Sequence, residues 1–261
     1  MKTKPYIPDS ILTTRNYKTM KGEAIGIKTY ILYMAPHTQN STGKSVCPKA
    51  SVGCAAACLY GSGKGSLSVV QKGRTNKTEL FFSDRELFLK MLYSEIAQIQ
   101  VKHEIEGGKF VIRLNGTSDI SYESLKIKDG KNIFELFKNV QFYDYTKNYL
   151  RFKKPLPKNY YLMFSRSETN DAIAMEMLKN KINVAMVFDN LPETYMGYKV
   201  IDGDVNDLRH LDEQGVIVGL KYKFLTGKNV NNEAAFKSGF AIKIKSNIVK
   251  LKNVVKLKKA A

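Results

Sequence analysis

Apolar segments alternate with polar segments along most of the chain, which predicts strands alternating with helices. About seven strands are expected, at residues 25–34, 110–114, 140–145, 160–164, 182–188, 198–201 and 216–220. The longest helix is expected to start at a capping box over residues 83–86 and to end at Gly107. Shorter helices are expected at 133–137, 170–180 and 204–211.

This order of elements indicates an α/β fold, with right-handed βα units on a parallel sheet. The strands suffice for a complete or partial parallel βα barrel, and an open doubly wound sheet is the alternative. In both architectures the functional site lies at the carboxyl ends of the strands. Polar residues that follow the predicted strands are therefore candidates for one site.

The chain is expected to divide into three parts. Residues 1–22 form an extended basic arm with prolines at positions 5 and 8, and residues 23–236 form a single α/β domain. Within that domain, residues 36–79 form a long polar, glycine-rich loop, a kind of segment that is usually functional or disordered. Residues 237–261 form a basic tail with a short internal repeat, Ile248–Asn253 and Val254–Lys259.

The net charge of +18 is concentrated at the two ends. Residues 1–82 carry a net charge of +9 and residues 237–261 one of +8, so the middle of the chain is almost neutral. Nucleic acid, either DNA or RNA, is the natural partner of such basic ends because it is a polyanion. The alternative is that the lysines only keep the protein soluble.

The composition favours a cytoplasmic protein that does not enter a membrane. No apolar run approaches the roughly 18 residues of a membrane span. The first ten residues contain lysines but lack the apolar core of a signal peptide. Thiols stay reduced in the cytoplasm, and three is an odd number of cysteines, so we do not expect a disulfide framework.

All three cysteines lie in one short segment, Cys47, Cys54 and Cys58, with the spacing C-x6-C-x3-C. The residues between them are mostly small, so the three thiolates can wrap around a soft metal centre. An iron–sulfur cluster is one interpretation. A zinc site is another, and it needs a fourth ligand, for which His37 is the nearest histidine. Three free or buried thiols are the third interpretation.

The cysteine motif resembles that of a phage and plasmid family, the gene-product-88-like proteins. The resemblance rests on Cys47-Pro-Lys-Ala, Gly53-Cys54 and Cys58-Leu-Tyr-Gly61, and on the later runs Asp144-Tyr-Thr-Lys147 and Val200-Ile-Asp-Gly-Asp204. It covers most of residues 25–225 and implies the host cytoplasm as the compartment. The family has no settled activity that the resemblance could transfer.

A more distant similarity is to radical S-adenosylmethionine enzymes, which carry a three-cysteine loop after the first strand of a partial βα barrel. It implies a 4Fe-4S cluster on the three cysteines, with S-adenosylmethionine bound at the open iron. The usual spacing there is C-x3-C-x2-C, and the different spacing here leaves the cluster type and the cofactor open.

The similarity also implies roles for the polar residues that follow the predicted strands. The turn after the second strand would help hold the methionine part of the cofactor, through Asn115, Gly116, Thr117 and Ser118. Five charged residues would hold cofactor or substrate at the rim: Asp119, Asp144, Lys147, Arg166 and Glu168. The alternative for these five is a loop salt bridge or a helix cap. The implied protein is an enzyme that acts on a nucleic acid or nucleotide.

The competing hypothesis is a nucleic-acid-binding protein with a structural metal site. Aromatic residues interleave with basic ones between positions 143 and 154, and could stack bases: Tyr143, Tyr145, Tyr149 and Phe152 with Lys147, Arg151, Lys153 and Lys154. The alternative is that these tyrosines lie on strands because they pack well there.

Overall fold

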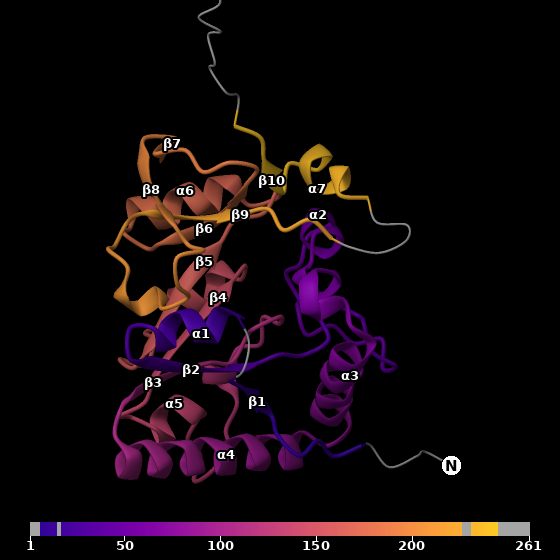
Figure 1. Cartoon of the computed structure of the whole chain (residues 1–261), viewed down its shortest axis with the longest axis vertical. Coiled ribbons are helices and arrows are strands. Elements are labelled where there is room, and N and C mark those ends of the chain that lie inside the picture. The colour runs from indigo at the N-terminus through magenta and orange to yellow at the C-terminus, as the bar shows by residue number, and fades with distance from the viewer. Residues whose placement is uncertain (1–5, 15–16, 226–230, 245–261) are drawn as a thin grey trace, which may run out of the picture.

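The computed structural model describes residues 6–14, 17–225 and 231–244, and these form a mixed α/β fold around one large sheet (Figure 1). Ten strands of the described chain join the sheet, in the order β1-β2-β3-β4-β5-β6-β9-β8-β7, with β10 beside β6. The predicted mostly parallel sheet is therefore confirmed. It runs from β1 to β7 without closing, so the predicted complete or partial barrel is not confirmed, whereas the alternative of an open sheet is compatible with the structure.

Seven strands form one continuous parallel series in the sheet. They are β2 (Ile27–Leu32), β3 (Lys109–Arg113), β4 (Gln141–Thr146), β5 (Tyr160–Ser165), β6 (Val184–Phe188), β9 (Ile217–Lys221) and β8 (Tyr198–Asp202). Each pairs in parallel with the next in this series, so their carboxyl ends share one edge. Two-residue antiparallel strands, β1 (Leu12–Thr13) and β7 (Thr194–Tyr195), flank them.

The sheet splits between β5 and β6 at its carboxyl edge. Strand β5 pairs with β6 only as far as Ala185, and β10 (Ala241–Ile242) pairs with the same strand from Val187 onward. Strand β9 follows the whole length of β6, so β10 takes the edge that β5 leaves. The chain near its C-terminal end thereby becomes part of the site edge.

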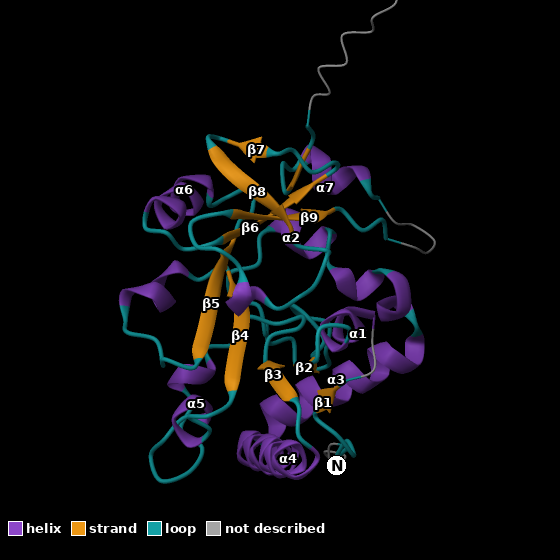
Figure 2. Cartoon of the chain, turned by 60° about the vertical axis from the view of Figure 1, so that its left-hand side comes forward, coloured by secondary structure: helices purple, strands orange, loops and turns teal. Residues whose placement is uncertain are grey.

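One face of the sheet packs against α4 (Arg85–Glu106), α5 (Ile133–Leu136) and α6 (Asp171–Lys179). The main core lies between α4 and strands β2 to β5, and a second core lies under α6. Leu162 and Phe164 share one face of β5 and contribute to these two cores respectively, because side chains two apart point the same way. Helix α3 (Ser68–Ser83) joins the main core through Leu80 and Phe81, and Figure 2 shows α2 (Val52–Ala56) across β4 and β5 from α6.

The opposite face carries polar side chains that residues 203–212 cover. Arg113 on β3 donates to Asp207 at 2.8 Å, and the hydroxyls of Tyr143 and Tyr145 on β4 donate to the same carboxylate at 3.2 and 2.9 Å. Leu208 packs beside them. The segment after β8 is thus tied to β3 and β4 by side chains, although the edge strands β1 and β7 do not pair with each other.

Several expectations about local structure are wrong. Helix α1 (Tyr17–Glu23) and strand β1 lie in the part expected to be an extended arm. Helices α2 (Val52–Ala56) and α3 (Ser68–Ser83) lie in the expected loop over 36–79, and only a 3-10 turn, Arg209–Leu211, lies in the expected helix 204–211. The apolar period of α3 is weak because its buried residues are confined to its last turns, at Thr78, Leu80 and Phe81. The cap of α4 is Asp84, which accepts from the Leu87 N–H, one residue later than expected.

The expected tail begins at the last residue of helix α7 (Glu233–Lys237), and its described part contains strand β10. The six-residue repeat lies outside the described residues. Among the helices of the described ranges, none has both the length and the apolar character to cross a membrane.

Candidate metal centre

The cysteine segment follows β2, and the loop after β3 holds its first half. The Gly116 N–H donates to Leu32 O at 2.9 Å, Thr117 Oγ1 donates to Met34 O at 2.6 Å, and the Asp119 N–H donates to Val46 O at 2.8 Å. Residue 46 precedes Cys47 directly. These hydrogen bonds therefore place Cys47 at the carboxyl edge of β2 and β3.

Glu168, from the loop after β5, holds the second half of the segment. Its carboxylate accepts from Ser51 Oγ and from the Gly53 N–H, both at 2.7 Å. Ser51 caps α2, and its hydroxyl accepts from the Cys54 N–H at 3.1 Å. Glu168 thus fixes the first turn of the helix that carries Cys54. Loops from three parallel strands, β2, β3 and β5, meet at the cysteines.

The three thiols are free, half-buried and close enough to affect one another. Burial raises the pKa of Cys47 to about 12, and the negative charges of Cys58 and Cys54 add to the rise. Burial also raises the pKa of Cys58, and Cys54 acts in the same direction. Thiolates that repel one another in a desolvated site are stabilised when a metal replaces their protons.

Backbone N–H groups already point at two of the sulfurs. The His37 N–H donates to Cys47 Sγ at 3.5 Å, and a hydrogen bond from the backbone of Tyr60 lowers the pKa of Cys58. Two cations, Arg74 and Lys147, act on Cys58 in the same direction. Donors and positive charge of this kind favour thiolates bound to a metal or a cluster.

Within the described ranges, no group of three His, Cys, Asp or Glu side chains is arranged to hold a metal ion as it stands. The ring of His37 faces the Thr38 hydroxyl, with Nδ1 at 3.1 Å from Oγ1. The Nε2 atom of His103 lies 3.0 Å from the hydroxyl of Tyr30. His210 is half-buried near the ring of Tyr143. A histidine-completed zinc site stays a prediction.

Two of the predicted rim carboxylates hold the loops around the cysteines. Asp119 accepts from Thr146 Oγ1 at 2.7 Å, from the Lys147 N–H at 2.9 Å and from Arg151 Nη1 at 3.1 Å. Asp144 is fully buried, and it accepts from the Asn115 N–H at 2.6 Å and from the Tyr160 hydroxyl at 3.1 Å. Their contacts are structural, and their catalytic roles stay predictions.

Arg166 and Glu168 likewise make structural contacts. Arg166 Nε donates to Asp171 at 2.6 Å, and Nη1 donates to the carbonyls of Gly239 and Phe240, which precede β10. Glu168 is the partner of Ser51 and Gly53 described above. Both residues therefore tie the loop after β5 to segments that surround the cysteines.

Lys147 is the predicted rim residue whose positive charge favours a cysteine thiolate, whereas the negative charge of Asp119 raises the pKa of Cys47. Lys147 Nζ donates to Ser165 Oγ at 2.7 Å and lies 5.6 Å from the centre of the Phe240 ring. Its positive charge lowers the pKa of Cys58. An ammonium group in this position can bind a carboxylate or phosphate beside the cysteines.

The predicted cofactor loop, residues 115–118, packs tightly on β2. A Cβ at Gly116 would lie 2.7 Å from Ile31 Cγ2, 2.7 Å from Tyr33 Cδ1 and 2.8 Å from Leu32 O. Asn115 Oδ1 accepts from Ser118 Oγ at 2.8 Å. Packing alone thus requires glycine at position 116, and cofactor binding by this loop stays a prediction.

The family model described as gene product 88 matches residues 10–243. The chain belongs to the gene product 88 family. The match covers the three cysteines and every strand of the described chain, so the predicted resemblance to this family is confirmed. The comparisons with curated proteins and with solved structures found no match.

Sequence reasoning missed Arg74 and Ser51 in this family member. Arg74 lies on α3, inside the segment expected to be a loop, and Ser51 caps a helix that was not expected. A Ser three residues before Cys54 is a capping signal that the sequence contains. The approach of Arg74 to Cys58 depends on how α3 packs, which no local pattern reveals.

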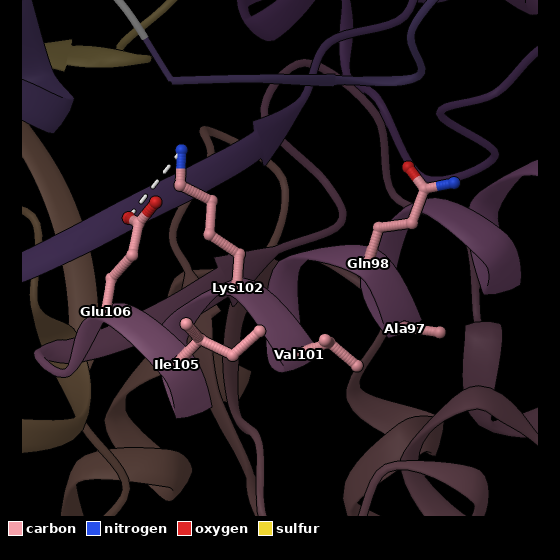
Figure 3. Close-up of a pocket in the computed structure, with 6 residues that line it drawn as sticks. All are labelled: Ala97, Gln98, Val101, Lys102, Ile105 and Glu106. Atoms are coloured by element: carbon pink, nitrogen blue, oxygen red, sulfur yellow. Dashed lines mark ion pairs between the residues drawn. The ribbon is translucent and has the colours of Figure 1, made fainter.

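A separate hollow lies on the exposed side of α4 (Figure 3). It is lined by Ala97, Gln98, Val101, Lys102, Ile105 and Glu106. Val101 and Ile105 are 53% and 80% exposed, and Lys102 pairs with Glu106 at 3.8 Å. Figure 1 shows α4 at the lower edge of the molecule and α2 well above it, so the hollow is not part of the cysteine site.

Gly53→Ala is expected to destabilise the protein by about 1–3 kcal/mol, because no space is left for the added methyl group where α2 packs against the turn between α7 and β10. A Cβ there would lie 2.5 Å from Ser238 Oγ and 2.8 Å from both Glu168 Oε1 and Phe240 Cβ. Gly73→Ala is the matched control, since nothing lies within 4 Å of its Cβ position on α3. That change should stabilise by about 0.5–1 kcal/mol. Urea unfolding of both variants measures the difference, and equal effects would contradict the proposed contact.

The contribution of Asp144 to stability is expected to fall as the pH rises from about 4 to about 6. Burial raises the pKa of Asp144 to about 6, and Arg113 and Arg151 oppose the rise. The folded protein therefore binds this proton more tightly than the unfolded chain does, and its stabilising contribution is lost as the pH passes the folded pKa. The expected loss is on the order of 2 kcal/mol.

Asp144→Asn isolates this effect, because the amide keeps an oxygen that accepts from the Asn115 N–H but does not titrate. The free energy of unfolding of the wild type minus that of the variant should decrease between pH 4 and pH 7. Two parallel pH curves from urea unfolding would show that Asp144 does not titrate in this range.

Proposed function

We propose that this family member holds an iron–sulfur cluster on Cys47, Cys54 and Cys58. We further propose that it acts as a radical S-adenosylmethionine-like enzyme on a nucleic acid or nucleotide. One observation carries the proposal. Three half-buried cysteines, whose thiolates would repel one another, are held by loops at the carboxyl edge of a parallel sheet, where α/β folds bind their ligands.

The donor set supports a metal–sulfur centre. Thiolates are soft ligands, and the residues that separate them here are small, so a bulky centre has room between them. The N–H groups of His37 and Tyr60 and the cations Arg74 and Lys147 would offset the negative charge of the ligands.

The surrounding residues support a role beyond structure. Given an external one-electron donor, such a cluster would supply the electron for cleaving a carbon–sulfur bond of S-adenosylmethionine, with release of methionine and a carbon radical. Lys147, held by Ser165, would bind an anionic group of the cofactor or substrate. The loop of Asn115 to Ser118 would border the same space, because it holds the segment before Cys47.

Charge supports a polyanionic substrate. The net charge is +18, and Lys44, Lys49, Lys64 and Lys72 are exposed along the cysteine segment and the start of α3. Lysines around a site attract nucleic acid by long-range electrostatics and release counterions when it binds.

Anaerobic reconstitution with iron, sulfide and a thiol tests the proposal. We expect a brown protein with a broad absorbance near about 400 nm and stoichiometric acid-labile sulfide. Reduction in the presence of S-adenosylmethionine should then release methionine. A protein that retains no iron or sulfide would overturn the proposal. A colourless protein with one zinc per chain would do the same, and would support a structural metal in a binding protein.

A further inference from the structure

Residues 231–244, which contain α7 and β10, cover the second half of the cysteine segment, and we call them the covering segment. Cys54 packs against the small apolar cluster that the covering segment forms with Ala57. A Cβ at Gly53 would lie 2.5 Å from Ser238 Oγ, so α2 lies directly against the turn between α7 and β10. Figure 1 and Figure 2 both show α7 next to α2. The covering segment therefore closes one side of the surroundings of Cys54.

The covering segment also reaches Lys147. The ring of its Phe240 lies 5.6 Å from Lys147 Nζ, which donates to Ser165 Oγ at 2.7 Å. Phe240 is buried and belongs to the apolar cluster that Cys54 touches. One aromatic side chain of the covering segment thus borders both the ammonium group and the surroundings of Cys54.

Little apolar surface holds the covering segment in place. Its cluster has five buried members among the described residues: Ala57, Tyr222, Ala235, Phe240 and Ala241. Three of them are alanines, whose methyl groups bury little apolar area, and β10 adds only two residues to the sheet. By contrast, α4 covers the sheet with large side chains such as Phe88, Leu92 and Ile96. A segment with few buried apolar contacts opens locally at a lower free energy than the whole protein.

Arg166, directly after β5, holds the turn between α7 and β10. Its Nη1 donates to the carbonyl of Gly239 and, at 3.0 Å, to that of Phe240. The guanidinium is itself oriented by Asp171 on α6, whose carboxylate accepts from Nε at 2.6 Å. Water can replace a backbone partner of this kind once the turn moves away, so these hydrogen bonds oppose opening only modestly.

Asp189, directly after β6, holds the other end of the covering segment. Its Oδ1 accepts from the Ile244 N–H at 2.9 Å, and its own N–H donates to Ile242 O at 3.0 Å. Asp189 thus fixes β10 and the residues that follow it to the end of β6. Together with Arg166 it attaches the covering segment to the carboxyl edge of the sheet through hydrogen bonds rather than through a large core.

The start of the covering segment is anchored separately. Asn232 Oδ1 accepts from the Leu225 N–H at 2.7 Å and from the Tyr222 hydroxyl at 3.1 Å, and Nδ2 donates to Leu225 O at 3.2 Å. These partners lie in the stretch after β9 and do not involve Arg166 or Asp189. The covering segment can therefore turn about Asn232 while β10 leaves β6.

We propose that the covering segment is a lid, which pivots near Asn232, is latched by Arg166 and Asp189, and controls access to Cys54 and Lys147. The lid goes beyond the proposed function, because it concerns access to these side chains whether or not a metal is bound. In the proposed enzyme, the open state admits ligands and the closed state shields them from water. The competing explanation is that the covering segment is a fixed part of the fold, which leaves only when the whole protein unfolds.

Hydrogen exchange of the full chain, followed by mass spectrometry at several low urea concentrations, separates the two explanations. We expect the Ile244 N–H to exchange at least about 100-fold faster than the amides of residues 88–99 on α4. Its rate should hardly change with urea, because local opening exposes little surface. The same exchange rate and the same urea dependence in both regions would overturn the lid.

Asp189→Ala tests the latch, because it removes the acceptor of the Ile244 N–H. Exchange of the covering segment should become roughly tenfold faster, with no change on α4. Asp202→Ala is the matched control, since Asp202 ends β8 at the same edge and accepts from the Asp204 N–H at 2.8 Å. Equal effects of the two substitutions on the covering segment would contradict the latch. If circular dichroism shows that Asp189→Ala is unfolded, the urea dependence of the wild type decides.

Access to the thiol is measured by labelling of the metal-free protein with N-ethylmaleimide. Asp189→Ala should raise the labelling rate of Cys54 at least about threefold. The rate of Cys47, which packs against the main core, should not change and serves as the internal control. An unchanged rate at Cys54 would overturn the control of access, even if hydrogen exchange showed opening. Because no iron is needed, a failed reconstitution would overturn the proposed function and leave the lid standing.

Discussion

Replacing Asp207 with alanine is expected to lower the free energy of unfolding by about 3–5 kcal/mol, because it leaves a buried cation without its partner. Asp207 and Arg113 form an ion pair at 2.8 Å, and their side chains are 6% and 9% exposed. The substitution also removes the acceptor of the Tyr143 and Tyr145 hydroxyls. Urea unfolding, followed by circular dichroism, measures the loss.

Two further variants make this prediction specific. Glu233→Ala breaks an exposed ion pair with Lys237 at 3.3 Å, whose side chains are 77% and 74% exposed, and it should cost less than about 0.5 kcal/mol. Combining Asp207→Ala with Arg113→Met should recover part of the loss, since no unpaired charge then stays buried. If Asp207→Ala proved as mild as Glu233→Ala, residues 203–212 would not hold the open sheet together.

Replacing Cys58 with serine is expected to abolish binding of the proposed iron–sulfur centre. Serine has nearly the same shape, but its hydroxyl is a hard, weakly acidic ligand that iron–sulfur clusters rarely accept. Cys58 also receives the backbone hydrogen bond from Tyr60 and the field of two cations, and both favour the thiolate that the proposed centre needs. Iron and sulfide analysis and the absorbance near about 400 nm measure the effect.

Ser66→Ala is the control for this prediction, because it removes a hydroxyl that bonds within the same segment, to Gly63 O at 2.7 Å, without removing a thiol. That variant should reconstitute like the wild type. A Cys58→Ser protein that retained full iron and sulfide would exclude Cys58 as a ligand, and would require a different third residue.

The strands and the shared edge could be predicted from sequence because both depend on short-range pattern. The run at 182–188 has the continuous apolar character of a strand buried on both faces, and the structure places β6 there in the middle of the sheet. The position of the cysteines after the first parallel strand follows from chain order alone. The confirmed features are thus the ones that periodicity and connectivity determine.

Contacts between distant segments could not be predicted in this way. Asp207 lies 94 residues from Arg113, and the sequence gives no sign that the segment after β8 returns to β3. Tyr143 and Tyr145 were candidates for stacking bases, yet their hydroxyls bond to Asp207 inside the protein. Pattern shows that a side chain is polar or aromatic, but only packing shows which group it meets.

The place of β10 has a consequence for biosynthesis. This strand fills the gap that β5 leaves beside β6, and the turn before it touches Gly53 and accepts from Arg166. Residues 1–240 must therefore be synthesised before the last segment of the site around the thiols is available. We expect the proposed iron–sulfur centre to be loaded after this strand has been added, because the site around the cysteines stays open until then.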